Sequence, residues 1–172
     1  MRVYLTGFMG AGKTSVGESL ARHLAVAFVD LDREIEAASG LTVREIFERH
    51  GEAEFRRLER EALARTLALD DVVVAAGGGT LTFPENADLV ATHGLSVWLN
   101  VPFAVIVARL GAGGRPDRPL FRDETQAFEL YRDRLGAYQR SDIRLDIGAD
   151  EQVDEVAARL ALRLGRKVTC AT

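Results

Sequence analysis

The sequence lacks the features that mark secreted, membrane-spanning and nucleic-acid-binding proteins. It has one cysteine, Cys170, in 172 residues, which excludes an internal disulfide and a cysteine-based metal site. No apolar run approaches the roughly 20 residues that a membrane span needs. The net charge is −4 and no long basic run occurs, so nucleic acid is a poor candidate partner. The N-terminus enters a predicted strand within three residues, which leaves no room for a signal peptide. We therefore expect a cytoplasmic protein with no membrane or nucleic-acid partner.

Short apolar runs alternate with helical patterns along the chain. The predicted strands are residues 3–5, 27–29, 72–75, 96–99 and 143–147. The predicted helices are 14–25, 32–38, 43–49, 52–68, 84–92, 102–110, 125–138 and 151–164. Three of the strands are nearly continuous apolar runs, which is typical of parallel strands covered on both faces. We predict a single α/β domain over residues 1–172, with a parallel sheet of about five strands and helices on both faces. Ligands of such sheets bind at the carboxyl ends of the strands.

A complete phosphate-binding loop follows the first predicted strand. It reads Gly7-Phe8-Met9-Gly10-Ala11-Gly12-Lys13-Thr14 and matches the pattern G-x-x-x-x-G-K-[ST]. Its glycines allow backbone N–H groups to surround phosphate oxygens. Lys13 can reach the terminal phosphates, and the Thr14 hydroxyl can ligate Mg²⁺. A chance glycine-rich turn would need neither these two residues nor a strand and a helix on either side, so we predict a nucleoside triphosphate site.

Acidic residues and glycines follow the next two strands. Asp30-Leu31-Asp32 ends the second strand, where a carboxylate could hold Mg²⁺ or act as a base. Acidic residues at this position often only cap a helix, and Asp32 could cap the helix that follows. Gly77-Gly78-Gly79 ends the third strand. It predicts either close approach of a ligand to the backbone or a tight turn without a ligand.

One face of the helix at 52–68 carries both signs of charge. The residues that share it are Glu52, Arg56, Glu59 and Arg60, at helical spacings of three and four. Such a face is commonly a solvated surface with salt bridges. The alternative is that Glu59 orients Arg56 toward an anionic substrate.

Two segments exceed what a simple alternation of strands and helices requires. Residues 32–68 hold two or three helices, with Thr42 and Glu45 predicting a capped start and Gly51 a helix stop. We predict a substrate-binding subdomain over 32–62, the alternative being an insertion that only packs. Residues 111–124 are rich in glycine, proline and arginine, which predicts a mobile lid or else a solvated linker.

Taken together, these motifs resemble the shikimate kinase family. The resemblance rests on the phosphate loop extended to Gly17, Asp30-Leu31-Asp32, Phe55-Arg56, Gly77-Gly78-Gly79 and Arg118-Pro119-Leu120. They occur in the family's order and spacing over roughly residues 2–164. The resemblance implies a P-loop kinase fold and transfer of the ATP γ-phosphoryl group to the 3-hydroxyl of shikimate. Shikimate 3-phosphate and ADP are the implied products, on the route to chorismate and aromatic amino acids. Mg²⁺ as cofactor, ATP and shikimate as partners, and a monomeric state are implied as well.

The same resemblance implies roles for individual residues. The implied catalytic residues are Lys13, Asp32 and Arg118, with Asp32 as the base and Arg118 descending from the lid. The implied ATP-binding residues are Gly10, Ala11, Gly12, Lys13, Thr14, Ser15, Arg109 and Arg118, with Arg109 near the adenine. The implied shikimate-binding residues are Asp32, Arg56, Gly78, Gly79 and Arg134, in a pocket lined by Phe47 and Phe55. The implied Mg²⁺ site consists of Thr14, as a ligand, and Asp30, which would help through water.

The sequence departs from the family's pattern near Arg134. The family commonly shows Arg-x-Pro-x-Tyr, whereas this chain has Gly136 in place of the proline. Tyr138 supports the register, and Arg132 and Arg140 are nearby competitors for the role of Arg134.

Two other functions compete with this interpretation. Small P-loop kinases of nucleoside monophosphates or gluconate share the phosphate loop and the lid. The combination of Asp32, Arg56 and three glycines favours a hydroxylated carboxylic acid over a nucleobase. A kinase-like binding module without catalysis is the non-enzymatic alternative, and the intact phosphate loop and acidic residues argue against it.

Overall fold

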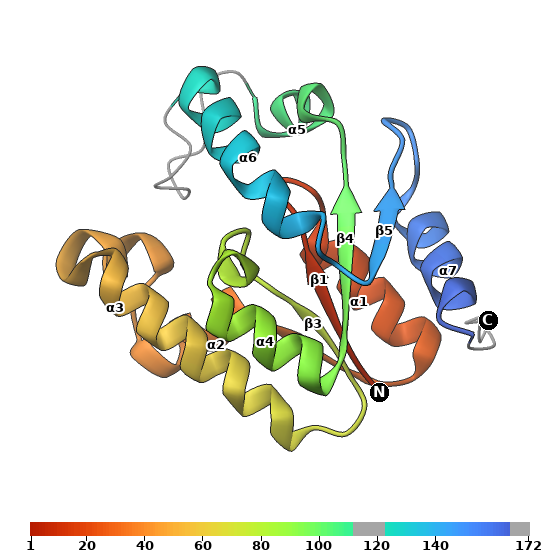
Figure 1. Ribbon diagram of the computed structural model, residues 1–172, viewed down its shortest axis with the longest axis horizontal. Coiled ribbons are helices and arrows are strands. Elements are labelled where there is room, and N and C mark those ends of the chain that lie inside the picture. The colour runs from red at the N-terminus through yellow and green to blue at the C-terminus, as the bar shows by residue number, and fades with distance from the viewer. Residues whose placement is uncertain (112–122, 166–172) are drawn as a thin grey trace.

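Five parallel strands form one sheet in the order β2-β3-β1-β4-β5 in the computed structural model, which describes residues 1–111 and 123–165. The strands are β1 (Arg2–Thr6), β2 (Ala27–Asp30), β3 (Val72–Ala75), β4 (Leu95–Asn100) and β5 (Ile143–Asp146). Figure 1 shows them as a twisted sheet between helices. All five predicted strands are confirmed to within one residue at each end.

Seven α-helices are present in the described part of the chain. They are α1 (Lys13–Leu24), α2 (Leu31–Ser39), α3 (Val43–Arg65), α4 (Pro84–His93), α5 (Phe103–Leu110), α6 (Glu124–Tyr138) and α7 (Val153–Arg163). Two short 3₁₀ turns, η1 (Thr66–Ala68) and η2 (Thr80–Thr82), lie on either side of β3. None of these helices has the length and apolar character that crossing a membrane would require.

Helices cover both faces of the sheet, and successive side chains of a strand point to opposite faces. In β1, Leu5 packs into one hydrophobic cluster with Leu20 of α1 and Leu160 of α7. Its neighbour Tyr4 packs into a second cluster with Ile46 of α3 and residues of α2 and α4. The prediction of a parallel α/β sheet with helices on both faces is therefore confirmed.

The helices between β2 and β3 lie close to their predicted positions, except that α3 ends at Arg65 and residues 66–68 form η1. Thr42 and Glu45 form a reciprocal capping box that starts α3. Gly40, at φ 68°, ends α2. Gly51 has φ 81° and ψ 175°, so it interrupts α3 and separates two helical segments. The predicted stop at Gly51 is confirmed.

Parallel strands bring the loops that follow them to one edge of the sheet. The phosphate loop follows β1, Asp30 ends β2, and the triple glycine follows β3. Because β3 lies between β1 and β2, these three segments are neighbours at that edge. Most of the predicted lid at 111–124, Arg118 included, lies outside the described residues.

Candidate active site

The phosphate loop requires glycine at three positions. Gly7, Gly10 and Gly12 have φ values of 140°, 79° and 90°, which L side chains rarely adopt. A Cβ added at Gly7 would also lie 2.8 Å from the carbonyl oxygen of Leu99. The side chain of Lys13 folds back over the loop, where its Nζ donates to the carbonyl oxygens of Gly7 at 2.9 Å and Phe8 at 3.0 Å. Helix α1 begins at Lys13, directly after these glycines, so its N-terminus with its partial positive charge lies at the end of the loop.

A cavity of about 280 Å³ adjoins this loop. The predicted ATP-binding residues that line it are Gly10, Gly12, Lys13, Thr14, Ser15 and Arg109. Ala11 differs from them, because its side chain is buried in the core and its N–H donates to the Phe8 carbonyl oxygen at 3.1 Å. The structure thus brings Arg109, at the end of α5, to the phosphate loop from almost 100 residues away.

Thr14 and Asp30 are in direct contact. The Thr14 hydroxyl donates to Asp30 Oδ2 at 2.6 Å. The other oxygen, Oδ1, accepts from the backbone N–H groups of Asp32 at 3.0 Å and Arg33 at 3.4 Å. Asp30 is therefore the N-cap of α2, and the alternative in which Asp32 caps this helix is wrong. The reason is that β2 continues to Asp30 and the helix begins immediately after it, so Asp32 already lies in the first turn.

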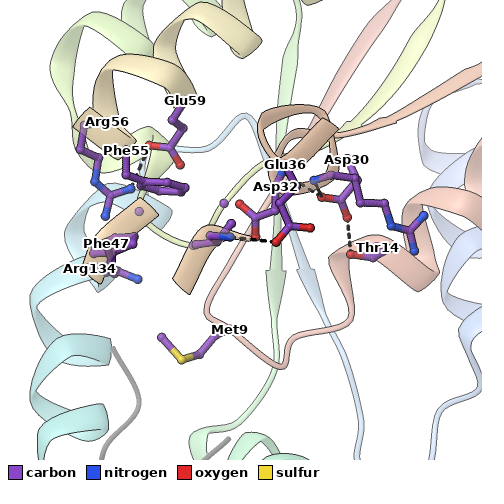
Figure 2. A pocket seen from close by; sticks show the side chains of 15 residues that line it. Met9, Thr14, Asp30, Asp32, Glu36, Phe47, Phe55, Arg56, Glu59 and Arg134 are labelled. Atoms are coloured by element: carbon purple, nitrogen blue, oxygen red, sulfur yellow. Dashed lines mark hydrogen bonds and ion pairs between the residues drawn. The ribbon is translucent and has the colours of Figure 1, made fainter. Parts of the chain in front are cut away.

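A second cavity, of about 340 Å³, lies between α2, α3, α6 and the triple glycine (Figure 2). Its walls differ in chemistry. Phe47 and Phe55 supply an aromatic wall, with ring centroids 4.8 Å apart. Arg56 and Arg134 supply guanidinium groups, and Asp32 supplies a carboxylate. Arg33 lines it too, together with the carboxylates of Asp30, Glu36 and Glu59. The cavity thus offers an apolar surface, guanidinium groups and carboxylate hydrogen-bond acceptors to one small ligand.

The two cavities share a wall. The residues that line both are Thr14, Asp30, Asp32, Gly77 and Gly78. A ligand in the larger cavity would therefore lie next to a phosphate group in the smaller one.

Arg56 is held on several sides. Its Nη1 donates to Glu59 Oε2 at 2.9 Å, and its Nη2 donates to Glu52 Oε1 at 2.9 Å. The guanidinium also lies over the rings of Phe55 and Phe83, 5.1 Å from each centroid. Burial alone would lower the pKa of Arg56, but the Glu59 and Glu52 carboxylates outweigh it and the pKa is raised. The sequence left open whether Glu59 orients Arg56 toward an anionic substrate, and that interpretation requires this contact between the two side chains.

Arg134 and Arg56 converge on the triple glycine. Arg134 is buried although it carries a charge. A Cβ added at Gly79 would lie 3.0 Å from Arg56 Nη2 and 3.1 Å from Arg134 Nη2. At Gly78 the nearest atom would be Arg134 Nη1, at 3.3 Å. The glycines therefore leave room for the guanidinium groups, whereas the competing residues Arg132 and Arg140 are exposed.

Tyr138 contacts the glycine loop of the site from behind the cavity wall, and the sequence did not predict this contact. Its hydroxyl donates to the Gly78 carbonyl oxygen at 2.6 Å, and its ring stacks on Trp98. Burial raises the pKa of Tyr138 from 10.0 to about 12, so the phenol keeps its proton and remains a hydrogen-bond donor above pH 10. The available signal was its position one helical turn after Arg134, which places both on one face of α6.

The model of one protein family matches residues 9–164, and its description is "Shikimate kinase". The chain belongs to the shikimate kinase family. A shikimate kinase from Salinibacter ruber is 41% identical over 172 residues, covering 93% of this chain and 82% of the relative. The structure of a shikimate kinase from Acinetobacter baumannii in complex with shikimate has a TM-score of 0.89 and 32% identity, covering 98% of this chain and 95% of that one.

Other kinases share the fold with less similarity. The structure of a gluconokinase from Sinorhizobium meliloti covers 95% of this chain and 95% of its own, with a TM-score of 0.55 and 19% identity. This likeness shows a common fold alone. It gives the gluconate alternative no support beyond the architecture.

Proposed function

We propose that this chain is an ATP-dependent kinase that transfers the γ-phosphoryl group of ATP to the 3-hydroxyl of shikimate. The observation that supports this most is the wall shared by the two cavities, of which one lies beside a phosphate loop and the other is lined by Arg56 and Arg134 among its residues. Phosphoryl transfer depends mainly on positioning and on electrostatic stabilisation. Adjacent sites for a triphosphate and for a small hydroxylated acid meet that requirement.

On the nucleotide side, the glycine-rich loop would donate backbone N–H groups to the phosphates. Lys13 would exchange its contacts with the Gly7 and Phe8 carbonyl oxygens for the transferring phosphate, whose charge it would neutralise. Arg109 would lie near the adenine, and Arg118 would reach the phosphates from a lid at 111–124.

Thr14 and Asp30 fit the modest demands of Mg²⁺. This ion commonly takes one or two protein ligands and completes its shell with phosphate oxygens and water. A hydroxyl and a carboxylate oxygen already lie 2.6 Å apart here. Thr14 would ligate the ion together with the nucleotide phosphates, and Asp30 would help through water. When bound, Mg²⁺ would supply neutralisation of the phosphate charge.

On the acceptor side, Arg56 and Arg134 would bind the shikimate carboxylate. A guanidinium pairs with a carboxylate through two parallel hydrogen bonds, and two such groups meet at Gly79. Phe47 and Phe55 would pack against the ring. Backbone N–H groups of Gly78 and Gly79 would donate to the substrate. Asp32 would accept from its hydroxyls and act as the base.

Residues 32–62 would then form the substrate-binding subdomain, since α2 and most of α3 supply one side of the larger cavity. A monomeric state and a cytoplasmic location are further parts of this proposal. Analytical ultracentrifugation and cell fractionation would test them.

The proposed reaction is tested by coupled ADP release with Mg-ATP and, separately, shikimate, gluconate and AMP. We expect fast ADP release with shikimate alone, together with a product that ³¹P NMR identifies as shikimate 3-phosphate. Equal release without an acceptor, or a preference for gluconate or AMP, would refute the assignment.

A further inference from the structure

Glu59 is a fully buried charge with a separate partner for each carboxylate oxygen. Its exposed fraction is 0%. Oε2 accepts from Arg56 Nη1 at 2.9 Å, and Oε1 accepts from the Thr80 hydroxyl at 2.6 Å. Burying a carboxylate is costly unless its oxygens are paired. The Thr80 hydroxyl therefore satisfies the oxygen that Arg56 leaves free.

The backbone around Glu59 is shaped to hold this carboxylate. A Cβ added at Gly77 would lie 2.6 Å from Glu59 Oε1 and 3.0 Å from Thr80 Oγ1. Gly77 has no left-handed φ, so the need for glycine here is one of space. The first glycine of the triplet thus makes room for the hydrogen bond between Thr80 and Glu59.

Thr80 is itself fixed at both backbone groups. Its N–H donates to the Gly77 carbonyl oxygen at 3.1 Å, and its carbonyl oxygen accepts from Asn86 Nδ2 at 3.0 Å. Both Thr80 and Asn86 are buried, and Asn86 belongs to α4. The hydroxyl is therefore presented to Glu59 from a turn that packing and hydrogen bonds hold in place.

We propose that Thr80 is a positioning residue that fixes the orientation of Arg56 through Glu59. This role rests on the proposed binding of the substrate carboxylate by Arg56. The other carboxylate that holds Arg56, that of Glu52, is 55% exposed, so the buried pair with Glu59 limits its motion more. Since Thr80 directly follows Gly79, the same turn sets both the arginine and the proposed backbone donors. Without the hydroxyl, Glu59 Oε1 is left buried and unpaired, and the carboxylate reorients and releases Arg56.

The test compares Thr80→Val, which keeps the shape and removes the hydroxyl, with Thr80→Ser, which keeps the hydroxyl. Thr66→Val is a matched control. Thr66 is also a buried threonine next to α3, but its hydroxyl bonds to Tyr4 and to the Leu63 carbonyl oxygen, in the second hydrophobic cluster. The measurements are kcat and the KM values for shikimate and ATP, with circular dichroism and Tm for each variant.

We expect Thr80→Val to raise the KM for shikimate about tenfold, equal to about 1.4 kcal/mol, while kcat and the KM for ATP stay close to wild type. Thr80→Ser should restore the KM for shikimate. Thr66→Val should lower Tm and leave both KM values unchanged. If Thr80→Val does not fold, Thr80→Ala provides the same comparison.

Two outcomes overturn the role of Thr80. One is an active Thr80→Val enzyme with an unchanged KM for shikimate, and the other is a parallel rise in both KM values. A wild-type protein without shikimate-dependent turnover refutes the proposed function itself, and this role with it. The two failures are therefore distinguished by the wild-type measurement.

Discussion

The Tyr138 hydroxyl at the end of α6 donates to the carbonyl oxygen of Gly78, 60 residues earlier in the chain, at 2.6 Å. This hydrogen bond ties the helix that carries Arg134 to the glycine loop beside it. It also fixes the orientation of the peptide group that follows Gly78. The proposed N–H donor of Gly79 belongs to that peptide group, so its direction depends on Tyr138.

Removing this hydroxyl should affect substrate binding. Tyr138→Phe loses a partly buried hydrogen bond, which costs about 1 kcal/mol of stability. We expect a higher KM for shikimate and a nearly unchanged KM for ATP, measured by steady-state kinetics. Tyr131→Phe is the control. Tyr131 also lies in α6, but its ring packs on Phe8 and Phe103. Equal kinetic effects of the two variants would contradict the prediction.

The same tyrosine should make stability fall at high pH. The pKa of Tyr138 is raised from 10.0 to about 12 by burial, so the folded state keeps a proton that the unfolded state loses. This contribution is fully present below pH 10 and is lost as the pH rises through about 12. Urea unfolding at pH 9 and pH 11 should show a drop of roughly 1–2 kcal/mol in wild type that Tyr138→Phe lacks. An equal drop in both proteins would show that other groups cause it.

Gly136 should limit the stability of α6. It lies inside the helix, and an added Cβ would meet no atom within 4 Å. Gly136→Ala should therefore raise the free energy of unfolding by about 0.5–1 kcal/mol. Gly51→Ala is the matched contrast, since its Cβ also meets open space but its φ is 81°. That variant should lose about 1 kcal/mol or more. Denaturant titration of both variants checks the pair, and stabilisation by both would contradict it.

Arg56→Leu should weaken the binding of shikimate far more than that of ATP. It removes a charged pair that would be desolvated with the substrate bound, a loss of roughly 2–5 kcal/mol. Isothermal titration with each ligand measures the effect. Arg57→Leu is the control, because Arg57 forms its ion pairs with Glu54 and Glu61 on the exposed side of the same helix. Weakened ATP binding with unchanged shikimate binding would show that this region does not bind the acceptor.

Substitutions of Asp32 and Asp30 should affect different kinetic properties, namely kcat and the Mg²⁺ requirement. Asp32→Asn removes the proposed base and its charge, so we expect a large loss of kcat with little change in Mg²⁺ dependence. Asp30→Asn keeps a side chain that caps helices well, but weakens the proposed contact with Mg²⁺ through water, so the Mg²⁺ requirement should rise. Turnover measured across a Mg²⁺ titration distinguishes the two, and the reverse pattern would exchange their roles.

The sequence predicted those parts of the fold that depend on local patterns. The buried strands, the capping box at Thr42 and the break at Gly51 each follow from residues close together in the chain. The phosphate loop is a continuous motif, so its glycines and Lys13 were also predictable.

Contacts between segments far apart in the chain could not be predicted from the sequence pattern. Nothing local distinguishes Thr80 as the partner of Glu59 or Tyr138 as the partner of Gly78. The cap of α2 depends on where β2 ends, and the sequence pattern suggested Asp32 for this role, whereas the structure has Asp30. The family resemblance favoured Arg134 over Arg132 and Arg140, and the structure distinguishes them physically, because Arg134 is buried and the other two are exposed.

The pairing of β1 with β3 has a mechanical consequence for the site. Leu5 is opposite Ala75 in the ladder, and the Ala76 N–H donates to the Leu5 carbonyl oxygen at 3.0 Å. Gly7 and Gly77, each two residues further on, thus leave the sheet at the same level. The starting points of the phosphate loop and of the triple glycine are set by main-chain hydrogen bonds, which side-chain changes scarcely alter. Inserting one residue into either strand would displace one loop by about 3.3 Å relative to the other, enough to separate donor from acceptor. Evolution of new acceptor specificity on this scaffold is therefore expected to proceed through substitutions in α2, α3 and α6, with the lengths of β1 and β3 unchanged.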